Sequence, residues 1–152
     1  TSNLNFVAGQ TKANLVIVPL SSDGYATLWS MQRAHYVIDV YGWFPDGASF
    51  RPLDATRLLD TRNNNDAVDT GAVVNLQVTG TGGVPSSGVA AVLGNLTVTQ
   101  PTGPGFLQAF PAGGAVPPTS SLNYASGETV ANAVIANVGE GGKISLRAHV
   151  AP

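Results

Sequence analysis

An internal repeat constrains this chain more than any other feature. Residues 1–20 and 119–138 align without gaps at an offset of 118, and ten of the twenty positions are identical. The similarity continues weakly at residues 142–146, after which no counterpart of residues 35–44 (HYVIDVYGWF) follows. Recurrence of this length indicates a repeated structural unit. The chain therefore divides into residues 1–44, the C-terminal portion of one repeat of about 118 residues, a junction at 45–52, and 53–152, most of the next repeat without its closing strand.

Alternating apolar and polar residues predict short strands. Val74, Leu76 and Val78 alternate with polar residues, as expected for a half-buried strand. Segments rich in Gly, Pro, Ser and Asp separate such runs and predict turns. The spacing of these turns favours an all-β fold, an antiparallel β-sandwich or flattened barrel of short strands with almost no helix. The other predicted strands are residues 36–44, 92–99, 106–110 and 143–147.

Residues 129–138 (TVANAVIANV) are compatible with either a short helix or a strand, because alanine favours helix. Their repeat counterpart, residues 11–20, contains a β-branched run and the interior Pro19, both unfavourable in a helix. Two copies this similar are expected to share one conformation. We therefore predict a strand in both.

Several short phrases recur in the cyclic order of a known repeat. They are RLLDTR at 57–62, GGVP at 82–85, AVLGNLTVTQPT at 91–102, GFLQAFP at 105–111, the repeated segment at 119–132, and residues 35–44. In this order they resemble a tandem repeat of secreted and cell-surface proteins of actinobacteria and other soil bacteria.

The resemblance implies an all-β extracellular module, used in arrays or beside other domains. In that module a strand containing LDTR opens the unit and a VDVxGYF-like strand closes it. It supplies no catalytic residues. Gly94 stands where a larger residue is common in the repeat, which predicts a close backbone approach or a β-bulge.

Composition bears on partners and location. A net charge of −2 with seven Lys and Arg argues against nucleic acid and anionic lipid as partners. No apolar run is long enough to predict a membrane span. Only 11% of the residues are charged, and Gly, Ser, Thr and Asn are frequent, which is typical of extracellular or cell-surface modules. The absence of cysteine removes disulfides and thiolate chemistry.

Charged residues in the predicted opening and closing strands form the first candidate site. Asp60 and Arg62 are two residues apart and would share one face of a strand. Asp39 is flanked by apolar residues and needs a donor, for which Arg57 or Arg62 is suited. We expect a structural ion-pair set that ties the two strands together. The alternative, a carbohydrate-contacting or catalytic pair of acids, lacks a second acid at a recognisable spacing.

Metal and general-base sites find little support. The oxygen-rich segment 63–69 (NNNDAVD) contains ligands that suit Ca²⁺, but their spacing matches no known loop, and we expect a solvated loop. His35 and His149 each end an Arg-Ala-His tripeptide just after a predicted strand, so a structural role is favoured. Without an HExxH spacing they form no zinc site. We predict no catalytic residues, no metal and no cofactor.

Four aromatic residues are the remaining candidates: Trp29, Tyr41, Trp43 and Phe44. If exposed, they could stack on sugar rings, whereas buried or intersubunit positions would indicate packing. We expect a non-enzymatic extracellular structural module that assembles head-to-tail with copies of itself, by strand or sheet complementation, into an array, filament or stalk. The alternative is a carbohydrate-binding module of a secreted enzyme or adhesin, with a cell-surface glycan as its partner.

Overall fold

The computed structural model describes residues 4, 6–10, 12, 14–18, 20–40, 43–44, 50–64 and 67–150. The chain forms two compact units. The first comprises Thr1–Leu15 and Arg51–Pro152, and the second comprises Val16–Phe50. Every described strand belongs to the first unit, and the described residues of the second unit contain neither strand nor helix.

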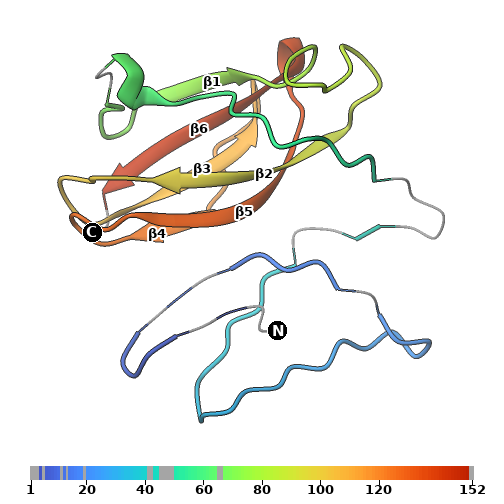
Figure 1. Cartoon of the computed structure of the whole chain (residues 1–152), viewed down its shortest axis with the longest axis vertical. Coiled ribbons are helices and arrows are strands. Elements are labelled where there is room, and N and C mark those ends of the chain that lie inside the picture. Colours follow the sequence, from blue (N-terminus) through green and yellow to red (C-terminus); the bar gives the residue numbers. More distant parts are fainter. Residues whose placement is uncertain are drawn as a thin grey trace. The chain divides into compact units, whose positions relative to one another are not determined.

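The first unit is an all-β sandwich of two antiparallel sheets, as the sequence predicts (Figure 1). The larger sheet has the strand order β1-β6-β3-β4, and the smaller sheet pairs β2 with β5. Two short 3-10 turns, η1 (Thr61–Asn64) and η2 (Glu140–Gly142), are its other elements among the described residues. The strands are β1 (Val73–Gln77), β2 (Ala91–Val98), β3 (Gly105–Pro111), β4 (Leu122–Tyr124), β5 (Val130–Asn137) and β6 (Lys143–Val150).

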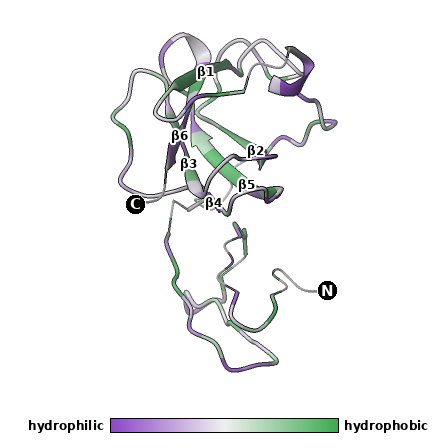
Figure 2. Cartoon of the chain, turned by 90° about the vertical axis from the view of Figure 1, so that its left-hand side faces the viewer, coloured by the Kyte–Doolittle hydropathy of each residue, from purple (hydrophilic) through white to green (hydrophobic). Residues whose placement is uncertain are grey.

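The core lies between the two sheets, where the alternating apolar residues of each strand meet. Leu146 of β6 is buried, and Val74 of β1 lies opposite it in the ladder. Ile144 is likewise buried opposite Leu76. Figure 2 shows this hydrophobic character along β1, β2 and β5, in contrast to the hydrophilic η1. The main buried cluster consists of Val78, Ala136, Ile144 and Leu146, packed with Val74, Leu76, Val92, Leu96, Ala109 and Val138. Phe110, Ala112 and Leu122 are also buried.

The predicted strands of the second repeat are confirmed, but those of the first repeat are not. Residues 129–138 contain β5, whereas the described residues among 11–20 and 36–44 lie outside any strand. The prediction of strands in those two segments was therefore wrong. β5 pairs with β2 over eight residues, and the first repeat has no counterpart of β2 within these 152 residues. An extended segment without a partner cannot form the ladder hydrogen bonds that define a strand.

The strand implied for the opening segment is also absent. Residues 51–60 lie outside any strand, and Thr61–Asn64 form η1. Asp60 ends the extended conformation locally. Its Oδ1 accepts the Arg62 backbone N–H at 3.2 Å, and its carbonyl oxygen accepts the Asn63 N–H at 3.3 Å. An aspartate in this position satisfies the first free N–H groups of a helical turn.

Gly94 does not mark a bulge or a close backbone approach, so that prediction was wrong. It pairs in regular register with Val134. A Cβ atom built on Gly94 would have no heavy atom within 4 Å, apart from its chain neighbours. The glycine instead leaves open space on its side of the sheet.

Candidate functional site

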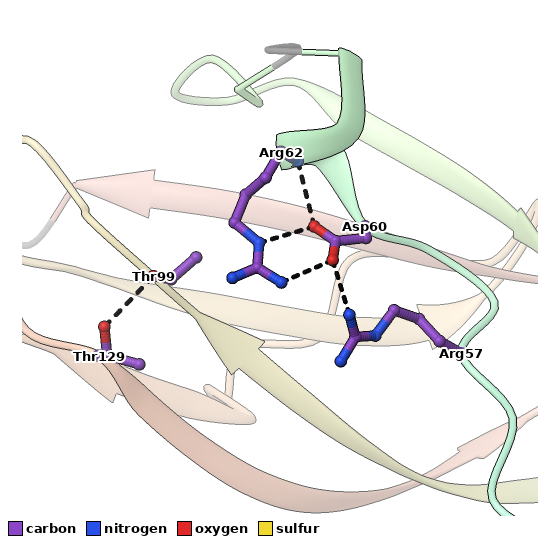
Figure 3. A network of polar contacts seen from close by, with 5 residues as sticks. All are labelled: Arg57, Asp60, Arg62, Thr99 and Thr129. Atoms are coloured by element: carbon purple, nitrogen blue, oxygen red, sulfur yellow. Dashed lines mark hydrogen bonds and ion pairs between the residues drawn. The ribbon is translucent and has the colours of Figure 1, made fainter.

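Three of the four predicted ion-pair residues come together around Asp60 (Figure 3). Arg62 donates from Nε to Asp60 Oδ1 at 2.8 Å and from Nη2 to Oδ2 at 2.6 Å. Arg57 donates from Nη1 to the same Oδ2 at 2.8 Å. The pairing with Arg62 is bidentate, the geometry in which an arginine binds a carboxylate most strongly. We call these three residues the Asp60 cluster.

The Asp60 cluster is a surface feature with a covered carboxylate. The Asp60 side chain is 9% exposed, whereas the Arg57 and Arg62 side chains are 69% and 59% exposed. The hydrogen bonds from Arg62 hold the pKa of the Asp60 carboxyl well below its usual range, and the same contact raises the pKa of Arg62. Asp60 is therefore ionised at neutral pH and is a poor proton donor. With two cations around one anion, the cluster has a net charge of +1.

Asp39, the fourth residue of the predicted set, belongs to the second unit and is exposed. Its side chain makes no ion pair or hydrogen bond within the part of the chain that the structure describes. A contact with Arg57 or Arg62 would join the two units. Pairing of Asp39 with these arginines therefore stays a prediction.

The second unit exposes its large apolar side chains. Trp29 is 81% exposed, Trp43 is 84% exposed and Phe44 is 55% exposed, while Tyr41 lies outside the described residues. So many exposed large apolar side chains in one unit are unusual for a monomer and are typical of an interaction surface. The exposed apolar residues between positions 36 and 44 are Tyr36, Val37, Ile38, Val40, Trp43 and Phe44. We call residues 36–44 the apolar segment.

The histidines and the oxygen-rich loop form no metal site in the described residues. His149 lies inside β6, not after it, and its ring stacks on Phe106 at a centroid distance of 5.1 Å. His35 is exposed in the second unit. No group of three or more His, Cys, Asp or Glu side chains converges anywhere in the described ranges. Residues 65 and 66 of the predicted loop lie outside the described ranges.

Among the described residues, no helix is long and apolar enough to cross a membrane.

A cavity not anticipated from the sequence opens beside the Asp60 cluster. Its volume is about 290 Å³, and Leu59 and Thr61, which flank Asp60 in the sequence, line it together with Val74 of β1. Val68, Asp69 and two alanines complete a mostly apolar wall. Leu53, Leu58 and Leu59 of the opening segment remain 38–51% exposed. The opening segment therefore covers this side of the sandwich incompletely.

No strand of the described residues pairs with the outer edge of β2 in the two-stranded sheet, and we call this the free edge of β2. Val138 N–H donates to the Ala90 carbonyl at 2.9 Å, which fixes the alternation of the antiparallel ladder. By that alternation, the backbone N–H and C=O groups of Leu93, Asn95 and Thr97 point away from β5. Within the described residues these groups make no backbone hydrogen bond to another segment.

A buried asparagine of β5 connects the smaller sheet to two other segments of the first unit. Asn132 of β5 is 8% exposed. Its Oδ1 accepts the Leu15 N–H at 3.1 Å, and its Nδ2 donates to the Ser121 carbonyl at 2.7 Å. Asn132 therefore joins β5 to the chain preceding β4 and to the N-terminal segment. Sequence reasoning missed this residue; its recurrence as Asn14 in the repeat was the available signal.

Comparison of the chain with protein-family models, curated proteins and solved structures finds no match. The cavity, the free edge of β2 and the apolar segment are the structural features that bear on function.

Proposed function

We propose that this chain is a structural repeat module of an extracellular or cell-surface protein, which assembles with copies of itself into an array, filament or stalk. The observation that carries the proposal is that each unit has a feature for which it provides no partner. Among the described residues, one unit has a two-stranded sheet with an unpaired edge, and the other has a strongly apolar segment that belongs to no sheet. If the apolar segment is added to the sheet as a strand, the backbone groups of the edge gain hydrogen-bond partners and the apolar side chains are buried.

The free energies of apolar burial, chain ordering and hydrogen bonding favour strand addition over loose apolar contact. In a strand, Tyr36, Ile38, Val40 and Phe44 would share one face, and burying these four side chains is worth roughly 6–12 kcal/mol at about 1.5–3 kcal/mol each. Ordering the nine backbone residues costs roughly 9–18 kcal/mol, at about 1–2 kcal/mol per residue. Apolar burial alone therefore does not exceed the cost of ordering the segment. A strand edge adds ladder hydrogen bonds, each worth about 0.5–1.5 kcal/mol net, which loose apolar contact lacks.

Composition supports an extracellular or surface location. The chain has few charged residues, and its phrases resemble a repeat of secreted and surface proteins. The Asp60 cluster supports a structural role, because its carboxylate is fully engaged by arginines.

Mass in solution tests this proposal. Light scattering of the purified chain over a hundredfold range of concentration is expected to show a mass that rises with concentration, and electron microscopy of the concentrated sample is expected to show linear particles. A constant monomer mass over the whole range would contradict assembly.

Binding of a carbohydrate is the second candidate, because Trp29 and Trp43 are both more than 80% exposed. Pull-down of the chain by insoluble polysaccharides, with a Trp29→Ala/Trp43→Ala double variant as control, separates the two. Retention that the double variant loses, in a chain that stays monomeric, would favour the glycan-binding function.

A further inference from the structure

We propose that the apolar segment of one copy adds to the free edge of β2 in a second copy, as the third strand of the smaller sheet. This inference rests on the proposed function and assigns its donor and acceptor. The donor is residues 36–44, and the acceptor is the outward edge of β2 together with the cavity beside the Asp60 cluster.

The edge of β2 lacks the features that normally protect an edge strand. β2 (AVLGNLTV) has eight residues and contains no charge, no proline and no bulge. An unpaired strand of this kind is a template for another strand. Leu93, Asn95 and Thr97 at the outward positions of β2 are exposed, whereas Ala133 and Ile135 at outward positions of β5 are partly buried. β2 is therefore the more accessible edge of the smaller sheet.

Vacant space on the inner face of β2 matches a bulky donor. Gly94 shares this face with Val92 and Leu96, which are partly buried against the core. Gly94 is nevertheless exposed, and no heavy atom lies within 4 Å of the position that its Cβ would take. Aromatic side chains on an adjacent strand commonly cover a glycine in this way. The apolar segment ends in Trp43 and Phe44, which can supply such a ring.

The opening segment provides the other wall. Residues 53–58 lie beside the connection between β1 and β2, where a Cβ at Gly83 would lie 3.5 Å from Cδ2 of Leu53 and one at Gly82 would lie 2.9 Å from Cδ2 of Leu58. Leu59 lines the 290 Å³ cavity with Val74. Leu58 and Leu59 are 38% and 43% exposed. A strand added along β2 would bury them.

Charge complementarity supports this placement. Asp39 is the only charged residue of the apolar segment. The Asp60 cluster has a net charge of +1, and Arg57 is 69% exposed with a single hydrogen bond to Asp60. Asp39 of an added strand can therefore pair with Arg57, which would realise the predicted tie between closing and opening segments.

A second copy is the favoured donor. Within one chain the apolar segment belongs to the second unit, and β2 belongs to the first. Every copy thus has one donor and one acceptor, in different units. Such head-to-tail contacts are heterologous and propagate into linear arrays unless the rotation between copies closes a ring.

Two matched pairs of full-length variants test the assignment. Asn95→Pro removes an outward N–H from β2, and Ala133→Pro makes the same change at the residue paired with it on β5. Val40→Asp disrupts the donor, and Met31→Asp is its control, because both residues are more than 80% exposed in the second unit. Asn95→Pro and Val40→Asp are expected to be monomeric at concentrations where wild type and both controls assemble.

Mixing the two blocked variants gives the sharpest readout. Asn95→Pro retains an intact donor segment, and Val40→Asp retains an intact β2 edge. An equimolar mixture is therefore expected to form a 1:1 heterodimer and nothing larger. Assembly that persists in a folded Asn95→Pro variant, or that Ala133→Pro abolishes instead, would overturn the assignment and leave the proposed function standing. A wild-type chain that never assembles would overturn both. If Asn95→Pro does not fold, Gly94→Leu replaces it, with Gly103→Leu as control, since neither added side chain meets a neighbour at its Cβ.

Discussion

At the scale of single residues, the sequence predicts contacts between residues that are close together in the chain. Asp60, Arg57 and Arg62 lie within six residues of one another, and the structure brings them together. The prediction that these residues lie in a strand is wrong, because the Asp60 side chain caps η1 locally. The surroundings of Gly94 could not be predicted in this way, since the space beside it depends on strands distant in sequence.

The stabilisation that Asp60 provides is expected to depend on pH. Its pKa is lowered in the folded chain, mainly by hydrogen bonds from Arg62. The stabilisation is therefore complete above the unfolded value of about 4 and is lost as the pH falls toward the folded pKa. The difference in melting temperature between wild type and Asp60→Asn should shrink between pH 5 and pH 2. It should also shrink in 1 M salt, because the arginines are exposed. An unchanged difference at pH 2 would contradict this account of the cluster.

Two glycines are expected to respond differently to the same substitution. A Cβ at Gly105 would collide with the His149 carbonyl oxygen and the Tyr124 ring, whereas one at Gly94 meets nothing. Gly105→Ala should therefore destabilise the fold by about 1–3 kcal/mol. Gly94→Ala should be neutral or stabilising by up to about 1 kcal/mol. Chemical denaturation of both variants measures this, and equal losses would mean that β2 is more crowded than described.

At the scale of elements, the strands of the second repeat follow from alternation and turn residues. β1, β2, β3 and β6 appear where the pattern predicts them. The first repeat has equally strong patterns but no strand in its described residues, since pairing needs a complementary edge as well as a suitable sequence. The open edge of β2 could not be predicted, because it depends on which strand β2 pairs with.

Asn132 is expected to be important for joining β5 to its neighbours. Asn132→Ala leaves the Ser121 carbonyl and the Leu15 N–H without this partner in a partly buried position. The expected loss is about 1–3 kcal/mol of unfolding free energy. Asn137→Ala on the same strand is exposed and should cost less than about 0.5 kcal/mol. Urea denaturation of the two variants tests the difference, and equal values would show that the Asn132 contacts contribute nothing.

At the scale of the whole molecule, regular structure forms only where partners are available. The first unit combines the second repeat with Thr1–Leu15 and contains both sheets, while the second unit contains the apolar segment. This division was not predictable from periodicity, which is similar in the two repeats. That residues 53–152 lack their closing strand stays a prediction from the repeat alignment, in which residues 35–44 have no second copy.

Amide hydrogen exchange, compared between dilute and concentrated samples of the full chain, tests strand addition to β2 most directly. On assembly, the outward amides of Leu93, Asn95 and Thr97 and the amides of residues 36–44 are expected to gain protection of at least tenfold, while the outward amides of β5 at Ala131, Ala133 and Ile135 change little. Protection that appears on β5 instead, or assembly that leaves the β2 amides unprotected, would contradict strand addition at this edge.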